Sequence, residues 1–200
     1  NVSEAMWEKF NLGYAPQDGS WLYSFLAKRH YSEELLAKSG LFSQNNPTYP
    51  LFRDRLMFPI RSWQGKTVAF GGRDLTFTSK AKYINSPETA IYSKKHHLFG
   101  LYESLDTIKK EQKAILCEGN FDVVALHQSG FTNAMAPLGT SFTEEQAKLL
   151  RRYCTSVEIL FDNDRAGQSA TAKALVIAQN IGMENSVLTL ESAKDASELV

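Results

Sequence analysis

The second half of the chain alternates short apolar runs with amphipathic segments. Strand-like runs lie at residues 113–117, 132–136, 157–161 and 186–190. Helical patterns lie between them, at residues 121–128, from Thr143 onward, and at residues 167–180. Strands that alternate with helices predict a parallel sheet covered on both faces, with right-handed crossovers.

Local signals mark the ends of these helices. Thr143 and Gln146 have capping-box spacing, so we expect a helix to begin directly after Thr143. Gly130 and Gly182 follow the other two helical patterns and are expected to stop them.

The first half of the chain has weaker periodicity. Ser20 is a candidate N-cap for a short helix with Trp21 and Phe25 on one face, and Ser32 is a candidate N-cap for another. Residues 55–60 and 66–70 read as a hairpin, and Gly71-Gly72 is expected to break its second strand. The aromatic side chains of the first 100 residues are interpreted mainly as core: Trp7, Tyr14, Trp21, Phe25 and Tyr83.

A polar segment separates the two halves. Residues 106–113 contain Lys109-Lys110-Glu111-Gln112-Lys113, which is typical of a linker. We therefore predict one subdomain over residues 1–111 and a second over residues 112–200.

Composition is that of an ordinary globular protein, at 43% hydrophobic and 22% charged residues. The net charge of zero conceals an asymmetry. Residues 51–100 hold nine Lys/Arg against three Asp/Glu, or +6, whereas residues 101–200 hold nine against fourteen, or −5. A basic middle beside an acidic half suits a phosphate-tracking surface next to a metal site. Scattered solvated lysines explain the same count equally well.

Other classes of protein find no support in the sequence. No apolar run reaches the roughly 18 residues of a membrane helix, and there is no signal-peptide pattern. Cys117 and Cys154 have no metal-binding spacing and are interpreted as small buried side chains. A cytoplasmic setting is therefore expected.

Four acids follow two of the strand-like runs. Glu118 and Asp122 come after residues 113–117, and Asp162 and Asp164 come after residues 157–161. Because the carboxyl ends of parallel strands lie along one edge of a sheet, these acids are expected to meet. Mg²⁺ prefers carboxylate and phosphate oxygens, so the pattern indicates metal-dependent phosphoryl chemistry. Helix capping is the competing explanation for Asp162 and Asp164, as is a helix-dipole role for Asp122.

These motifs resemble a known family. A Glu after one strand and Asp-x-Asp after a later one are the marks of a Toprim domain, which primases, topoisomerases and some nucleases share. The first half contains LFRDRLMFPIR, AFGGR, KYINSPET and LFGLY. Together these segments resemble the RNA polymerase core of a bacterial DnaG-type DNA primase, and the resemblance covers essentially the whole chain.

The resemblance implies a fold and an activity. The fold class is α/β, with a Toprim-type parallel sheet flanked by helices and preceded by a smaller mixed α+β basic subdomain. The activity is that of a DNA-directed RNA polymerase, which makes short RNA primers from ribonucleoside triphosphates on a single-stranded DNA template during replication. The expected cofactor is Mg²⁺ or Mn²⁺, and zinc is expected only in a separate domain before Asn1. A helicase-binding domain is expected after Val200, and the fragment itself as a monomer.

The resemblance also assigns residues. The catalytic acids are Glu118, Asp122, Asp162 and Asp164, and the metal ligands are Glu118, Asp162, Asp164 and Asp195. The expected nucleic-acid and nucleotide contacts are Arg53, Arg55, Arg73, Lys82, Asn85 and Lys94. This chain departs from the family where a third pair, Asp-Pro-Asp, reads Asp195-Ala196-Ser197, and where a basic position reads His96. The Ser197 departure leaves the number of metal ions open.

Two other functions compete with primer synthesis. A Toprim nuclease or topoisomerase would share the acids, but the motifs of the first half do not fit it. A non-catalytic nucleic-acid-binding module would explain the altered third acidic pair. The presence of Glu118, Asp162 and Asp164 argues against such a module.

Overall fold

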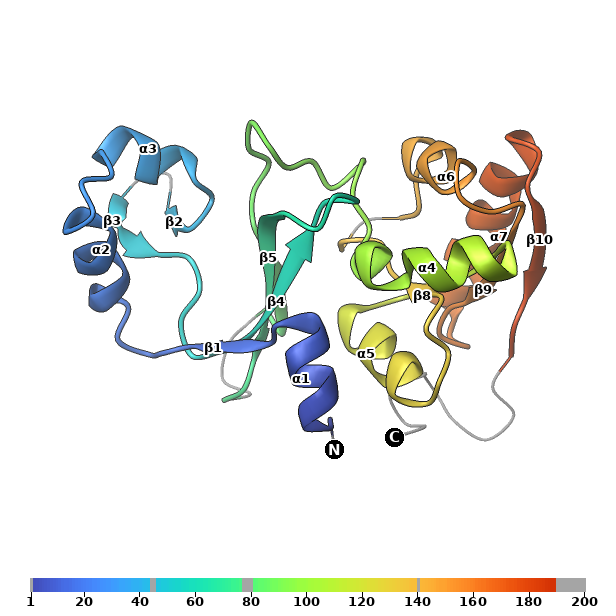
Figure 1. The fold of residues 1–200 in the computed structure, drawn as a ribbon, viewed down its shortest axis with the longest axis horizontal. Helices are drawn as coiled ribbons and strands as arrows, with labels where there is room; N and C mark the ends of the chain where they lie inside the picture. The colour runs from blue at the N-terminus through green and yellow to red at the C-terminus, as the bar shows by residue number, and fades with distance from the viewer. Residues whose placement is uncertain (1, 44–45, 77–80, 140, 190–200) are drawn as a thin grey trace.

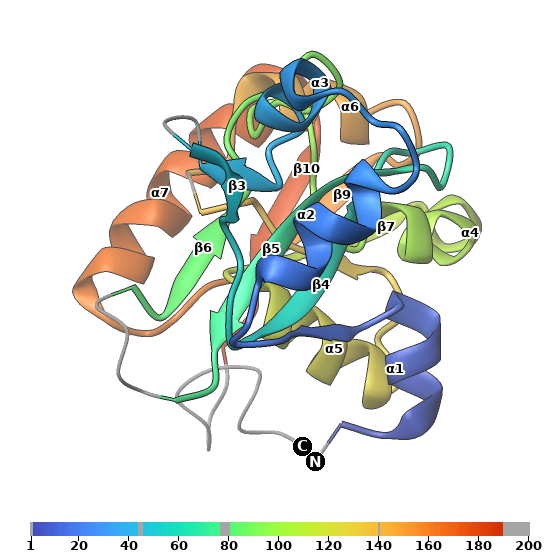
Figure 2. The same cartoon turned by 90° about the vertical axis from the view of Figure 1, so that its left-hand side faces the viewer.

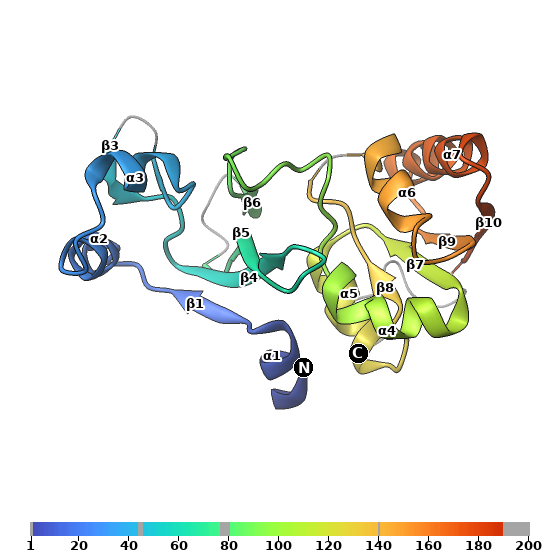
Figure 3. The same ribbon diagram turned by 45° about the horizontal axis from the view of Figure 1, so that its top comes forward.

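The computed structural model describes residues 2–43, 46–76, 81–139 and 141–189. Two four-stranded sheets lie side by side along the molecule, and a small group of short helices and strands sits beyond the first sheet (Figures 1 and 3). Asp195, Ser197 and Glu198 fall outside the described residues.

The first sheet is antiparallel, in the order β1-β4-β5-β6. Its strands are β1 (Gly13–Ala15), β4 (Arg55–Arg61), β5 (Thr67–Asp74) and β6 (Tyr83–Asn85). The predicted hairpin is confirmed as β4 and β5, which run on either side of a turn at Gly65 with φ of 83°.

The small group of helices and strands beyond the first sheet, called the terminal group below, precedes β4 in the sequence. It consists of α2 (Ser20–Ala27), α3 (Glu33–Lys38), β2 (Phe42–Ser43) and β3 (Asn46–Pro50), while α1 (Glu4–Phe10) lies apart, beside the second sheet (Figures 1 and 2). Ser32 caps α3 as predicted, accepting a hydrogen bond from Leu35 N at 3.2 Å. The N-cap of α2 is Gly19 rather than Ser20, because Ser20 is already the first residue of the helix, and its N–H donates to Asp18.

The second sheet is parallel, in the order β10-β9-β7-β8, which confirms the predicted parallel sheet of an α/β fold. Its strands are β7 (Lys113–Cys117), β8 (Ala134–Met135), β9 (Ser156–Leu160) and β10 (Glu184–Val187). Its helices are α4 (Leu101–Glu111), α5 (Asn120–Gln128), α6 (Glu144–Leu150) and α7 (Arg165–Asn180). Thr143 caps α6 in the predicted capping box with Gln146.

Both faces of the parallel sheet are buried, as its apolar strands predict. Successive residues of a strand point to opposite faces. Ile115 and Cys117 of β7 pack with the apolar residues of α5 and of the first sheet. Ala114 and Leu116 pack on the other side with α4, α6 and α7. The core between the two sheets therefore fixes β7 and α5 against β4 and β5.

Two sequence predictions about chain breaks are wrong. Gly71 and Gly72 do not interrupt β5, which continues through them to Asp74. They are glycines because side chains crowd both positions: a Cβ on Gly72 would lie 2.8 Å from the Phe52 ring. The polar segment 106–113 is not a linker, because residues up to Glu111 belong to α4, whose inner face is buried in the core of the parallel sheet. The boundary between residues 111 and 112 stays a prediction.

The aromatic side chains expected in the core lie at the surface. Trp7, Tyr14, Trp21 and Phe25 are all at least 40% exposed, and Tyr83 is 41% exposed. The terminal group has only the two-stranded β2–β3 sheet to pack on, so no residue of α2 is buried. The face that carries Trp21 and Phe25 is therefore exposed rather than part of a core. Within the described residues no helix combines the length and apolarity that crossing a bilayer demands.

His127 introduces a pH dependence into this core. It is a buried residue of α5, and its Nε2 lies 3.0 Å from Ala134 O and 3.1 Å from Ser104 Oγ. Phe10 of α1 packs edge-on against the ring, with 4.9 Å between centroids. Burial, with a smaller contribution from the charge of Lys9, lowers the pKa of His127 from 6.5 to about 4.

We expect the fold to lose stability as pH falls from about 6.5 to 4 through this residue. Over that range the unfolded chain binds a proton that the folded chain excludes, which costs about 3 kcal/mol by pH 4. Chemical denaturation of His127→Gln, which keeps a donor but does not titrate there, should give a shallower fall of unfolding free energy with pH. The exposed His96→Gln variant is the control, and equal slopes for all three proteins would contradict the assignment.

Candidate active site at the carboxyl ends of the parallel strands

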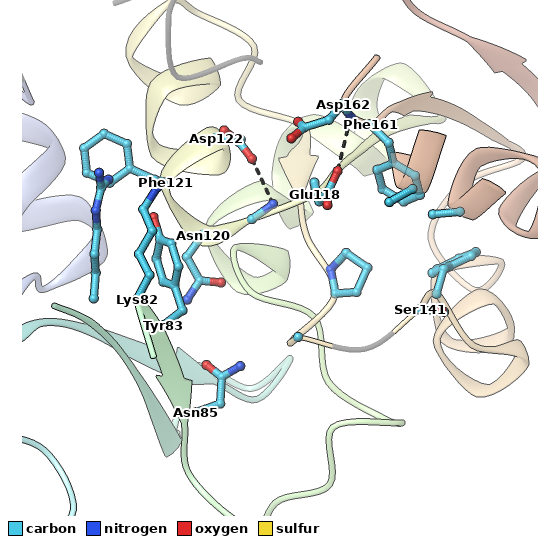
Figure 4. A pocket seen from close by; sticks show the side chains of 17 residues that line it. Lys82, Tyr83, Asn85, Glu118, Asn120, Phe121, Asp122, Ser141, Phe161 and Asp162 are labelled. Atoms are coloured by element: carbon cyan, nitrogen blue, oxygen red, sulfur yellow. Dashed lines mark hydrogen bonds between the residues drawn. The ribbon is translucent and has the colours of Figure 1, made fainter. Parts of the chain in front are cut away.

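Glu118 and Asp162 meet at one edge of the parallel sheet. Each follows the end of a strand, and the two strand ends are neighbours, because Cys117 of β7 pairs with Leu160 of β9. The Asp162 N–H donates to Glu118 Oε2 at 3.2 Å (Figure 4). The expectation that acids from two strand ends lie together is therefore met for this pair.

The other two acids each hold the start of a helix. Asp164 is the N-cap of α7 and accepts the Gly167 N–H at 2.8 Å. Asp122 lies in the first turn of α5 and accepts the Gly119 N–H at 2.9 Å (Figure 4). Asp164 thus has the capping contact that was the competing explanation for it, and Asp122 lies in the first turn of a helix, where the helix-dipole explanation placed it. Asp122 also lines the cavity described next, whereas Asp164 does not.

A cavity of about 570 Å³ opens in front of these acids, between the two sheets. The first sheet contributes Arg73, Lys82, Tyr83 and Asn85, and the second subdomain contributes the acids, Asn120 and Phe121. Figure 4 shows the acids on one side of this cavity and Lys82, Tyr83 and Asn85 facing them. Negative and positive side chains thus line opposite walls.

Cations and aromatic rings alternate on the wall formed by the first sheet. The Arg73 guanidinium lies 4.5 Å from the centroid of Phe121 and 5.6 Å from that of Tyr83. Lys82 Nζ lies 5.9 Å from the centroid of Tyr83. Arg73 therefore bridges the two subdomains, because Phe121 belongs to α5. Cation–π contacts of this kind hold an arginine in place while leaving its N–H groups free to donate.

The remaining basic residues of the prediction do not line this cavity. Arg53 stacks on Tyr49, with 4.3 Å between the guanidinium carbon and the ring centroid, beside a separate hollow next to α2. Arg55 is buried and donates to the carbonyls of Gly72, Ala81 and Lys82, so it ties β4 to β5 and to the chain entering β6. The prediction grouped these two with Arg73, but the structure separates them.

Lys94 sits on a segment that α6 holds. Gln146 is fully buried, and its Nε2 donates to Lys94 O at 2.9 Å and to His97 O at 2.7 Å. Thr143 Oγ1 donates to Lys95 O, and the Lys94 N–H donates to Glu88. The hydrogen bond from the Lys94 N–H lowers the pKa of Glu88. The backbone of residues 94–97 is thus fixed to the Toprim-type subdomain.

Replacing Gln146 by leucine is expected to destabilise the protein by about 2–4 kcal/mol, because two part-buried carbonyls lose the donor that the buried amide supplies. The exposed Gln179→Leu variant on α7 provides the matched control. Urea denaturation of both variants measures the difference. A loss below about 0.5 kcal/mol, the range of ordinary surface substitutions, would contradict a structural role for the amide.

Cys117 lies directly before Glu118 but stays neutral. The thiol is buried and donates to Met135 O at 3.4 Å. Burial, reinforced by the charges of Asp122 and Glu118, raises the pKa of Cys117 well above its usual range. The expectation of a small buried side chain is confirmed.

The donor set suits a hard divalent cation. Glu118 and Asp162 present oxygens from two strand ends to an open cavity, and such oxygens are the ligands that Mg²⁺ and Mn²⁺ take. Within residues 2–43, 46–76, 81–139 and 141–189, no three His, Cys, Asp or Glu side chains are close enough to hold a metal ion. The two acids on one wall therefore fit a metal ion whose remaining coordination positions would be filled by substrate phosphates and water.

Comparison with known proteins identifies the family of the chain. Residues 1–105 match the family model described as "DNA primase catalytic core, N-terminal domain", and residues 115–200 match one described as "Toprim-like". The chain belongs to the DNA primase catalytic core family. The resemblance inferred from the sequence motifs is thereby confirmed. A Toprim-containing primase core implies the use of a divalent metal.

Individual relatives extend over nearly the whole of this primase core. A DNA primase of Treponema pallidum is 42% identical, over 94% of this chain and 31% of its own. The structure of the Aquifex aeolicus primase (zinc-binding and RNA polymerase domains) has a TM-score of 0.90 at 37% identity, and the match covers 98% of this chain and 49% of that one. A DnaG primase catalytic domain bound to single-stranded DNA has a TM-score of 0.85 at 34% identity. That match covers 99% of this chain and 63% of the other. The chain spans about a third of the length of the curated relative.

Two residues that line the cavity were assigned no role from the sequence. Asn120 and Phe121 stand between Glu118 and Asp122, and both line the cavity. A signal for them was available in the sequence. They directly follow Glu118 and Gly119, at the point where the chain leaves the strand and begins a helix at the edge of the sheet.

Proposed function

We propose that this chain is the catalytic core of a DNA primase, which joins ribonucleotides into short RNA primers on single-stranded DNA. The observation that carries the proposal is the cavity between the two sheets, with Glu118 and Asp162 on one wall and Arg73 and Lys82 on the other. Nucleotidyl transfer needs both kinds of charge, because a polyanionic substrate must be held close to carboxylates.

The acids have distinct roles in this proposal. Glu118 and Asp162 hold Mg²⁺ or Mn²⁺, with Asp164 and Asp195 assisting, and Glu118 is also the candidate general base. The metal supplies charge neutralisation at the phosphates and lowers the pKa of the attacking 3′-hydroxyl. Asp122 positions the Glu118 loop, since its carboxylate holds the Gly119 N–H.

The cationic wall binds the nucleotide. Arg73 and Lys82 donate to triphosphate oxygens, with Asn85 beside them, and Tyr83 offers an exposed ring for a base to stack on. Arg55 acts from behind this wall, because its guanidinium holds the carbonyl of Lys82. Lys94 contributes charge to the same track.

The DNA template follows the remaining basic and aromatic side chains of the N-terminal subdomain. The related DnaG catalytic domain bound to single-stranded DNA supports a template site on this fold. Arg53 stacked on Tyr49 provides the combination of cation and ring that single strands favour. We further propose that the protein acts in the bacterial cytoplasm at the replication fork, with a replicative helicase as partner.

The test is metal-dependent incorporation of labelled ribonucleotides on a single-stranded DNA template. Synthesis that requires Mg²⁺ or Mn²⁺ and disappears in both Glu118→Ala and Asp162→Ala would support the polymerase and the acid site together. Template binding without synthesis, and without stabilisation by metal, would instead favour a non-catalytic binding module. A chain that binds no single-stranded DNA would contradict both functions.

A further inference from the structure

Asn120 presents an unused amide to the cavity. It is the first residue of α5, it is 8% exposed, and it lines the cavity wall. Its side-chain amide has no hydrogen-bond partner among the described residues. Figure 4 shows Asn120 between the acids and Asn85. The residue is largely buried but its side chain lines the cavity, so its amide can form hydrogen bonds with a ligand or with water there.

Asn85 joins Asn120 over a glycine. A Cβ on Gly71 would lie 2.6 Å from Asn120 Nδ2 and 2.9 Å from Asn85 Oδ1. A Cβ on Gly139 would lie 3.0 Å from Asn85 Nδ2. The two amides therefore converge on the face of β5 that a side chain at residue 71 would otherwise occupy. Together they form a neutral polar patch between two charged walls.

The chemistry of this patch favours hydroxyl groups over phosphate. At the same helix start, the Asp122 carboxylate already accepts the Gly119 N–H, so its negative charge opposes a second anion there. Phosphates have Arg73 and Lys82 available on the opposite wall. A carboxamide offers both a donor and an acceptor, which matches a hydroxyl group that is also both.

We propose that Asn120, paired with Asn85, binds the sugar hydroxyls of the incoming nucleotide and selects ribose over deoxyribose. This inference rests on the proposed function, because it names the group that distinguishes the substrate of an RNA polymerase from a deoxynucleotide. Asn120 is a substrate-binding residue in this scheme, and the acids remain the reactive groups.

Two measurements on the full chain test the inference. Calorimetry with Mg²⁺ compares the affinity for ATP with that for 2′-deoxyATP. Incorporation on a DNA template compares kcat/KM for the two nucleotides. The variants are Asn120→Ala and Asn85→Ala, with Asn180→Ala at the exposed end of α7 as the matched control. Gly71→Ala fills the gap between the amides from the β5 side, so it tests the same site if Asn120→Ala fails to fold.

We expect the wild-type chain and Asn180→Ala to prefer ATP. The preference should fall roughly fivefold or more in Asn120→Ala and Asn85→Ala, the factor that one hydrogen bond contributes. Gly71→Ala should reduce it as well.

The outcomes separate the inference from the proposed function. An unchanged preference in Asn120→Ala and Gly71→Ala, with wild-type synthesis intact, would overturn the inference and leave the polymerase in place. A preference in binding that Asn120→Ala removes, in a chain without synthesis, would support the inference and reject the polymerase. A wild-type chain that binds neither nucleotide, or both equally, would overturn the inference.

Discussion

Glu118→Gln is expected to lower ribonucleotide incorporation by on the order of 10²- to 10⁴-fold, the range associated with a positioned acid or base. Glutamine has nearly the same shape, and its Oε1 still accepts the Asp162 N–H that Glu118 now holds at 3.2 Å. Glu118 is exposed, so the change removes charge from the cavity without leaving a buried group unpaired. The loss should therefore appear in kcat at saturating metal, with little change in thermal midpoint.

The matched control for this experiment is Glu184→Gln. Glu184 is also exposed and lies at a strand end, but it begins β10 and so stands at the opposite edge of the parallel sheet. Its replacement should leave incorporation unaltered. Incorporation by Glu118→Gln within tenfold of the wild-type rate would show that this carboxylate is neither a metal ligand nor a base.

Gly167→Ala is expected to damage both stability and activity. A Cβ on Gly167 would collide with the Asp162 carbonyl oxygen and lie 2.8 Å from the Asp162 carbonyl carbon. These atoms are backbone, so residues 162–164 must shift and the Asp164 cap on the Gly167 N–H is disturbed. Overpacking together with the lost cap should cost about 2–4 kcal/mol. Misplacing Asp162 by about 1 Å should lower incorporation by roughly 10²-fold.

Gly13→Ala is the control that tests whether any replacement of a glycine by alanine lowers stability and incorporation. A Cβ on Gly13 would meet no atom within 4 Å, so this variant should resemble the wild type in urea denaturation and in incorporation. Wild-type behaviour of Gly167→Ala would show that the 162–167 turn tolerates a wider path than the structure describes.

The parallel sheet was predictable because its signals are local. The apolar runs at residues 113–117 and 157–161 coincide, within one residue, with β7 and β9. Thr143 and Gln146 form the capping box that their spacing predicts, since both partners lie within one helical turn. The acids after β7 and β9 followed from the same pattern, because the ends of parallel strands share one edge.

The first subdomain was less predictable, for physical reasons that individual residues illustrate. Gly71 was predicted to break the strand, yet β5 continues through it, and the glycine is there because Asn120 of α5 crowds the place where a Cβ would lie. Arg55 read as a phosphate contact, yet its guanidinium is directed to three backbone carbonyls. The group that decides the role of Gly71 is a side chain far away in the sequence. The groups that decide the role of Arg55 are backbone carbonyls, which every residue has and which no sequence pattern marks.

The sequence by itself determined the Toprim-type sheet, the strand-end acids and the family, because each depends on the order and spacing of neighbouring residues. Tertiary structure alone decided which basic residues face the cavity. Arg73 and Lys82 line it and Arg53 and Arg55 do not, although all four belong to one basic stretch. It alone also brought Asn120 and Asn85 together over Gly71. The reason is that the charge and polarity of a side chain can be read from the sequence. The surface that the side chain faces is set by the packing of one sheet against the other.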